Sequence, residues 1–201
     1  MSAFGRFSIE VVIMNFVQPI RDKRVVEAIR DYLRLRSERD YLLFSLGVYS
    51  GLRVSDLLNL RVRDVRGTHV EIVEKKTGKR KRFLIHPEVK KDLDKYIEGK
   101  HDHEFLFPSR QRKKSNGLPN QPVDRATVYK MLNKAARKFG LKNIGCHTMR
   151  KTWGYHLYMD NPRNLALLMQ MFNHSSETIT LMYLGLTQDM MDAAISKLSY
   201  A

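Results

Sequence analysis

Apolar residues recur at three- and four-residue spacing along most of this chain, whereas only residues 69–86 alternate in the manner of paired strands. Spacing of three and four places side chains along one face of a helix, and strict alternation places them on one face of a strand. Thr77-Gly78 interrupts the alternation, which predicts a hairpin of strands 69–74 and 80–86. The sequence therefore predicts a mainly α protein with a small antiparallel β-sheet, an α+β fold.

The predicted helices are short and are separated by turn residues. Residues 22–36 are predicted to form a first amphipathic helix, which Asp22 could cap. Residues 38–49 are predicted to form a second helix, which ends at Ser50-Gly51. A third, short helix is expected to open near Ser55. Further helices are predicted over residues 87–97, over residues 124–140 and, between turns at Asn161-Pro162 and Asn173, over much of the remaining chain, with a loop over residues 108–122.

The composition of the chain indicates a polyanionic partner. The 201 residues suffice for one main domain and carry 36 Lys plus Arg against 21 Asp plus Glu, a net charge of +15. Nucleic acid is preferred over an anionic membrane, because the sequence offers no amphipathic or lipidated anchor. The lone cysteine, Cys146, excludes an intramolecular disulfide and fits a reducing interior, so cytoplasmic residence is expected.

Two short motifs could each bring an arginine to an anion. In G-L-R-V-S-D, residues 51–56, Arg53 sits on a turn at a helix start, although taken alone the motif favours an arginine that pairs with Asp56 or caps a carbonyl. In H-T-M-R, residues 147–150, the histidine and arginine are three apart and share a helix face, so they could clamp a phosphate. Taken alone the second motif is weak, because a partly buried histidine bonded to a backbone carbonyl is common.

A histidine and a tyrosine follow near the end of the chain. His174 precedes Tyr183 by nine residues. Each has an ordinary alternative: His174 could flank a helix end, and Tyr183 could be a core aromatic with its hydroxyl at the surface. Neither residue indicates a function without the motifs before it.

In this order, the motifs resemble those of the tyrosine recombinases, the phage integrase family. That family carries an arginine in G-x-R-x-S-[ED], a lysine on a β-hairpin, an H-x-x-R box, a His or Trp, and a tyrosine about nine residues later. The hairpin lysine is matched best by Lys76, with Lys75 as the alternative, because strand alternation lets only one of them face the site. The matching residues are Arg53, Lys76, His147, Arg150, His174 and Tyr183.

The resemblance implies a site-specific recombinase or integrase. In such an enzyme Tyr183 would attack a DNA phosphorus to form a 3′-phosphotyrosyl link, with Arg53 and Arg150 holding the phosphate oxygens. Lys76 would protonate the leaving 5′-oxygen. His147 would assist proton transfer at the tyrosine and His174 would hydrogen-bond a phosphate oxygen. Because side chains meet the charge, no metal or other cofactor is expected.

The resemblance runs through nearly the whole chain. It predicts an N-terminal extension over residues 1–21 and a catalytic domain over residues 22–201, without the separate DNA-binding domain that usually precedes it in the family. Two departures are visible: Phe172-Asn173 stands where many members have Leu-Gly, and Lys151 stands where many have a second histidine. These departures bear on the subfamily more than on the chemistry.

Two basic runs are expected to line double-stranded DNA, with simple solubility as the alternative reading. An apolar helical stripe over residues 188–199 either closes its own core or docks on a neighbouring copy, as in a homo-tetramer on paired DNA sites. The His-Asp-His-Glu patch at residues 101–104 is interpreted as a solvated turn rather than a metal site. The DNA-binding residues predicted from the runs are Lys75, Lys79, Arg80, Lys81, Arg82, Arg110, Arg112, Lys113 and Lys114.

Two rival functions share this pattern. A DNA-binding regulator could keep the fold without strand exchange, although such a protein has no evident need for Tyr183. A type IB topoisomerase would use the same chemistry to relax supercoils, but its sequence signature is matched less well.

Overall fold

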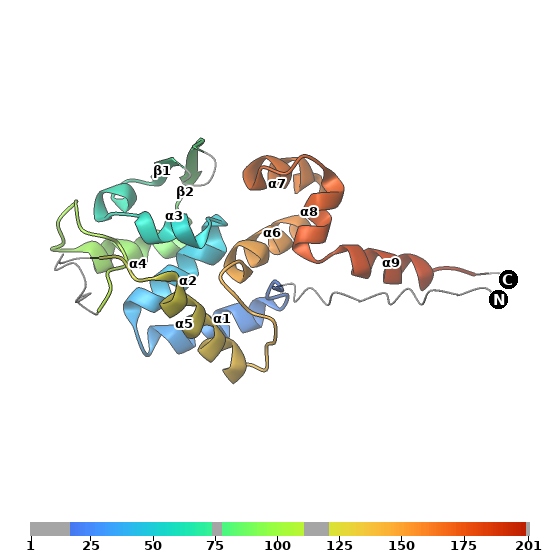
Figure 1. Cartoon of the computed structure of the whole chain (residues 1–201), viewed down its shortest axis with the longest axis horizontal. Coiled ribbons are helices and arrows are strands. Elements are labelled where there is room, and N and C mark those ends of the chain that lie inside the picture. Colours follow the sequence, from blue (N-terminus) through green and yellow to red (C-terminus); the bar gives the residue numbers. More distant parts are fainter. Residues whose placement is uncertain (1–16, 74–77, 111–120, 200–201) are drawn as a thin grey trace, which may run out of the picture.

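The computed structural model describes residues 17–73, 78–110 and 121–199. Helices dominate it, and one antiparallel pair of strands lies at an edge of the molecule (Figure 1). The mainly helical fold with a small two-stranded sheet is thereby confirmed. In order, the described elements are α1 (Lys23–Arg34), α2 (Glu38–Ser50), α3 (Val54–Asn59), η1 (Val62–Val65), β1 (His69–Val73), β2 (Arg80–Leu84), α4 (Pro87–Ile97), α5 (Arg125–Lys138), α6 (Thr148–Asp160), η2 (Pro162–Asn164), α7 (Leu165–Phe172), α8 (Glu177–Leu184) and α9 (Thr187–Ile195).

Local side chains fix several helix ends. The Asp22 carboxylate accepts from the backbone N–H of Arg24 and opens α1, as the sequence predicted. Helix α2 ends at Gly51, whose φ of 63° lies in the left-handed region that glycine adopts without strain. Helix α7 ends in the same conformation at Asn173, with a φ of 60°. Both ends turn the chain sharply toward residues of the predicted site.

The hairpin pairs β1 with β2 so that alternate residues share a face. Val70 lies opposite Phe83, and Glu71 lies opposite Arg82. Val70 is fully buried, whereas Arg80 and Arg82 are exposed. Strand β2 ends at Leu84 rather than at the predicted residue 86, because the chain then turns into α4.

Two hydrophobic clusters of different size hold the molecule together. The larger is built from α1 to α5, the hairpin and the start of α6, and includes Tyr41, Phe44 and Phe107. The smaller joins α7 and α8 to the middle of α6 through Phe172 and Leu184. Helix α6 therefore belongs to both clusters and connects the two parts of the protein (Figure 1).

The two ends of the described chain lie on the same side of the molecule. Residues 17–22 pack on α6, where the Ile20 backbone N–H donates to Thr152 Oγ1 at 2.9 Å. Helix α9 extends away from the body (Figure 1), none of its residues is buried, and Asp189 pairs with Arg21 at 2.8 Å. Among the described residues, no helix combines the length and apolar character that crossing a bilayer requires.

Candidate active site

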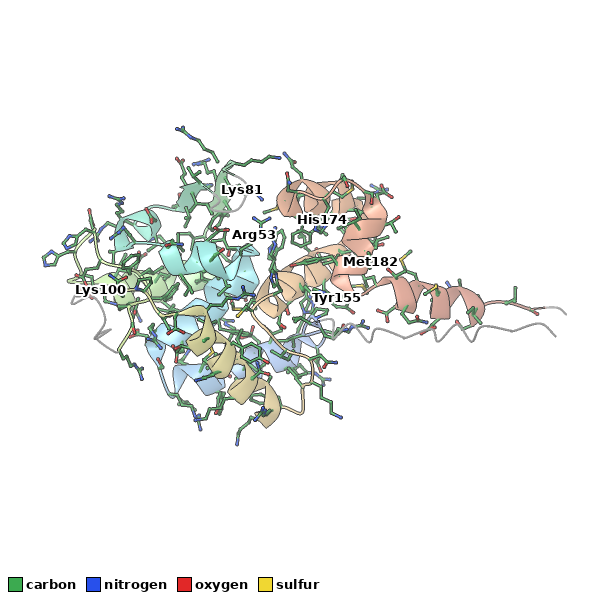
Figure 2. All side chains as sticks on the ribbon, in the orientation of Figure 1. Arg53, Lys81, Lys100, Tyr155, His174 and Met182 are labelled. Carbon is green, nitrogen blue, oxygen red and sulfur yellow. The ribbon has the colours of Figure 1, made fainter. Side chains whose placement is uncertain are left out.

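The structure brings together every described residue of the predicted catalytic set. Arg53 stands at the start of α3, His147 and Arg150 at the start of α6, His174 between α7 and α8, and Tyr183 in the last turn of α8. Figure 2 shows Arg53 near His174, which lies between α7 and α8. The predicted catalytic lysine, Lys76, and its alternative Lys75 lie outside the described residues.

Arg150 is the most deeply placed member of the set. Its side chain is held between two parts of the chain, because Nη1 donates to the Gly51 carbonyl and Nη2 donates to the Met171 carbonyl, the latter at 3.1 Å. The guanidinium carbon also lies 4.7 Å from the centroid of the Phe172 ring. These contacts fix the plane of a permanently charged, five-donor group at the junction of α2, α6 and α7.

Gly51 lets the α2 turn approach α6 closely. A Cβ atom at this position would lie 2.3 Å from Cε3 of Trp153, so only glycine fits even before its φ of 63° is considered. Its carbonyl receives the Arg150 hydrogen bond, and Arg53 follows two residues later as the residue before the first turn of α3. One turn therefore positions both arginines of the predicted catalytic set.

Tyr183 points its hydroxyl at the start of α6. The hydroxyl oxygen lies 3.4 Å from Nδ1 of His147, within hydrogen-bonding distance. Burial raises the pKa of the Tyr183 phenol, while the positive charges of Arg150 and Arg53 and a hydrogen bond from Arg150 act in the opposite direction. The environment thus favours a phenol in the resting protein and offsets part of the cost of its ionisation.

His147 is suited to accept a proton. Desolvation lowers the pKa of its imidazole, and the charges of Arg125, Arg150, Lys151 and Arg53 lower it further. A lowered pKa keeps the ring neutral at neutral pH, so Nδ1 can serve as a base toward the neighbouring hydroxyl.

His174 is oriented by a threonine on α8. The Thr180 hydroxyl donates to the Ser176 carbonyl at 3.2 Å and lies 3.1 Å from Nδ1 of His174, an arrangement that favours hydrogen on Nδ1 and turns Nε2 away from the threonine. The His174 and Tyr183 rings are 5.2 Å apart between centroids. Desolvation and the charges of Arg150 and Arg53 lower the pKa of His174.

The second strand of the hairpin reaches the end of α7. The Lys81 ammonium donates to the Met171 carbonyl, which also binds Arg150, and the Lys79 ammonium donates to Asn173 Oδ1. A pocket of about 430 Å³ lies between these elements and is lined by Lys79, Lys81 and Arg150 among others. Basic groups from α6 and β2 therefore share one pocket, and the labelled Lys81 can be followed in Figure 2.

The predicted DNA-binding residues fall into separate groups. Arg80 and Arg82 lie on the exposed face of β2, opposite to the face that carries Lys81. Arg110 is exposed and donates to Ser37 Oγ at 2.8 Å, at the start of α2. The remaining members of the set, Lys75, Arg112, Lys113 and Lys114, lie outside the described residues.

Three contributors to the site were not predicted from the sequence. None of them belongs to a motif: they are the Met171 carbonyl, the Thr180 hydroxyl and the side chain of Lys151, which the sequence marks only as a departure from the family pattern. In the patch at residues 101–104 the rings of His101 and His103 stack at 5.6 Å. No group of three or more potential metal ligands gathers in the described part of the chain.

Comparison with known proteins assigns the fold and the sequence to one class. The chain matches the Phage integrase family over residues 21–189. It is 38% identical over 182 residues to the probable integrase/recombinase YoeC of Bacillus subtilis strain 168, covering 90% of this chain and 96% of that protein. It is 30% identical over 201 residues to a tyrosine recombinase of Pseudothermotoga lettingae, covering 92% of this chain and 66% of that protein.

Solved structures show the same fold. The XerH recombinase bound to a palindromic difH substrate superposes with a TM-score of 0.67 at 18% identity, covering 90% of this chain and 53% of that one. A lambda integrase dimer bound to a COC′ core site gives a TM-score of 0.62 at 20% identity, covering 83% of this chain and 48% of that one. The chain thus spans about half the length of these two proteins.

Fold and sequence together define a tyrosine-type site-specific recombinase. The chain belongs to the phage integrase family.

Proposed function

We propose that residues 22–201 form a catalytic domain that cleaves and rejoins double-stranded DNA through a 3′-phosphotyrosyl intermediate, with Tyr183 as the nucleophile. The observation that carries this proposal is that a histidine and two arginines converge on the tyrosine hydroxyl. It lies 3.4 Å from Nδ1 of His147, and the charges of Arg53 and Arg150 act on its pKa. A base and two permanent cations around one phenol are what attack on a phosphodiester requires.

The proposed cleavage step replaces one bond at phosphorus with another. The Tyr183 oxygen forms a bond to phosphorus, and the bond from phosphorus to the 5′-oxygen breaks. The phenol proton passes to His147, whose lowered pKa keeps it neutral and ready to accept. The departing 5′-oxygen takes a proton from a hairpin lysine, which we assign to Lys76 with Lys75 as the alternative. Religation reverses these transfers, so the phosphotyrosyl bond itself retains the energy for rejoining.

The remaining residues stabilise charge on the phosphate. Arg53 and Arg150 would contact the non-bridging oxygens, a task for which Arg150 is already held in place by two backbone carbonyls. His174 would donate from Nε2 once a bound phosphate counters the arginine charges that lower its pKa. The orientation set by Thr180 supports this role.

Double-stranded DNA is the partner that the charge distribution supports. Arg80 and Arg82 are exposed on one face of the hairpin, and the pocket beside Arg150 is lined by Lys79 and Lys81. The solved XerH and lambda integrase structures are complexes with DNA. A DNA substrate and the unpaired Cys146 agree with the expected cytoplasmic residence.

We further propose that four copies assemble on paired DNA sites through α9. This helix has no buried residue, and its apolar residues Met190, Met191 and Ile195 are 49%, 48% and 70% exposed. The lambda integrase structure contains a dimer on DNA. A tetramer extends that arrangement to two recombining sites, and self-association without DNA is expected to be weak.

Covalent capture on nicked DNA tests the proposed reaction. Duplexes from the segments that flank the gene in its genome are nicked near candidate cleavage sites, so that the cleaved fragment diffuses away and the protein–DNA adduct accumulates. Wild-type protein is expected to give an adduct at the 3′-phosphate, and Tyr183→Phe is expected to bind the same duplexes without forming one.

The outcome separates the recombinase from its rivals. Capture that persists in Tyr183→Phe would exclude Tyr183 as the nucleophile. Tight binding by the wild-type protein without capture on any bound duplex would support a regulator instead. Capture by a protein that relaxes supercoiled plasmids but never joins two DNA sites would support a topoisomerase.

A further inference from the structure

A lysine is buried against the ring of the proposed nucleophile. Lys151 follows Arg150 on α6, and only 5% of it is exposed. Its ammonium nitrogen lies 4.8 Å from the centroid of the Tyr183 ring. Lysine is rarely buried to this degree, because removing an ammonium from water is costly. Such a placement beside a reacting tyrosine calls for a functional account.

Charged groups surround this pair from every neighbouring element. His147 and Arg150 face Tyr183 from α6, Arg53 acts on it from α3, and the His174 ring packs against it from the loop before α8. On its other side Lys151 lines a pocket of about 400 Å³ at the junction of α6, α8 and α9. Met182, labelled in Figure 2, lines the same pocket.

The charges that line the outer side of this pocket compensate one another. Arg21 and Asp189 both line it and form an ion pair at 2.8 Å. Because this pair is neutral as a unit, it neither supplies nor cancels a net charge next to the ammonium. The charge changes that Lys151 can respond to are therefore those of the reaction itself, which are the ionisation of Tyr183 and the protonation of His147, whose pKa the charge of Lys151 also lowers.

We propose that Lys151 is a positioning residue that holds a positive charge against the ring face of Tyr183 and thereby stabilises the negative charge that develops on this nucleophile during attack. The inference rests on the proposed function, since it requires Tyr183 to be the nucleophile. A phenolate spreads its charge from the oxygen into the ring, so an ammonium over the ring attracts the phenolate more strongly than the phenol. The interaction is strongest in the state that reacts.

Lys151 acts through charge and not by moving a proton. Its nitrogen lies over the ring, whereas Nδ1 of His147 is the group near the hydroxyl oxygen. The phenol proton therefore still passes to His147. The chain has this lysine where many members of its family have a second histidine, so the contribution is expected to distinguish it from those relatives.

The proposed role carries a cost in stability. Desolvation lowers the pKa of Lys151, which is the sign of an ammonium held in a poorly hydrated site. Replacing such a group with an apolar side chain of similar length often leaves a protein equally stable or more stable. Lys151→Met should therefore slow cleavage while leaving the melting temperature unchanged or raising it.

Single-turnover capture on a nicked duplex measures the effect on the full chain. Lys151→Met is expected to form the adduct roughly tenfold more slowly at neutral pH, an effect between those of an exposed and a fully desolvated cation–π contact. DNA affinity should be unchanged, and Lys151→Arg should recover most of the rate. Lys95→Met, which removes an exposed lysine on α4, is the matched control and should behave as wild type. Lys151→Gln is a second neutral variant, so that the result does not depend on the packing of one side chain.

The pH dependence separates this role from a structural one. Lys151 carries its charge below its lowered pKa and loses it as the pH rises through that value. The rate advantage of wild type over Lys151→Met should therefore be complete below this lowered pKa and disappear as the pH rises above it, at a lower pH than an ordinary lysine would require. A packing role would give a ratio that does not change with pH.

Three results would overturn this inference and leave the proposed function standing. Loss of capture in Tyr183→Phe together with a wild-type rate in both neutral variants would leave the nucleophile intact and remove any role for Lys151. A rate loss that is constant across pH, or unfolding of both neutral variants, would make Lys151 a structural residue. Persistence of capture in Tyr183→Phe would instead defeat the proposed function on which the inference rests.

Discussion

The carbonyl of Gly51 connects the two arginines of the site. It accepts a hydrogen bond from Arg150, and Arg53 follows Gly51 by two residues at the start of α3. The turn can sit this close to α6 because nothing projects from the Gly51 Cα toward the Trp153 ring. A methyl group here would disturb the position of both guanidinium groups together.

Gly51→Ala is therefore expected to destabilise the protein by more than its backbone conformation alone requires. Alanine at positive φ costs about 1–2 kcal/mol, and overpacking against Trp153 adds about 1–3 kcal/mol. Denaturant unfolding provides the measurement. Gly140→Ala is the control, because Gly140 has a φ of 69° and no atom within 4 Å of an added Cβ. Equal reductions in the free energy of unfolding for the two variants would show that the contact with Trp153 does not matter.

Only those residues of the site that belong to a sequence motif could be predicted. Arg53, His147 and Arg150 were predicted because their neighbours in the sequence identify them. The Met171 carbonyl and Thr180 could not be predicted, because any residue has a carbonyl and many threonines follow a helix cap. Their roles depend on how α7 and α8 pack on α6, and the local sequence does not predict this packing.

Elements were predicted well where local chemistry decides their bounds. The helix expected over residues 87–97 has those bounds, since Pro87 suits a first helical position and the apolar stripe ends at Ile97. The 3₁₀ helix η1 was not predicted, because its four residues are too few to show a period. The sequence predicts that the basic run at the hairpin forms one DNA-binding surface, but strand alternation divides the run, with Lys81 on one face and Arg80 on the other.

Helix α9 permits a test of assembly that leaves the fold of each copy intact. Ile195 is the last residue of α9 and Leu198 follows it; the two residues are 70% and 61% exposed and belong to neither cluster. Ile195→Glu with Leu198→Glu is expected to abolish the four-copy complex on paired DNA sites without lowering the melting temperature. Sedimentation of the protein–DNA complex reports the assembly.

The control for this prediction is Ser196→Glu, which places a negative charge on the exposed surface of the same segment. It should assemble as wild type. Four-copy complexes that survive the double substitution, or a stable tetramer of wild type without DNA, would contradict the proposed role of α9.

At the scale of the whole molecule, the net charge of +15 predicts that DNA binding weakens steeply with salt. Arg80→Ala with Arg82→Ala should make the plot of log affinity against log salt shallower by about 0.9 for each phosphate that the protein no longer neutralises. Fluorescence anisotropy at several salt concentrations measures the slope. Lys91→Ala with Lys95→Ala removes the same charge from the exposed side of α4. An equal change in slope for both pairs would mean that net charge, and not the hairpin, governs binding.

The division of the interior into two clusters has a consequence for control of the reaction. The tyrosine belongs to the smaller cluster, whereas the hairpin belongs to the larger. Regions that bury fewer apolar side chains open more often, so α8 should fray before the body of the protein does, an order that amide exchange would register. We expect a molecule in that half-open state to keep its hairpin contacts with DNA while Tyr183 lies away from the phosphate, so that fraying of α8 would lower the rate of unintended cleavage.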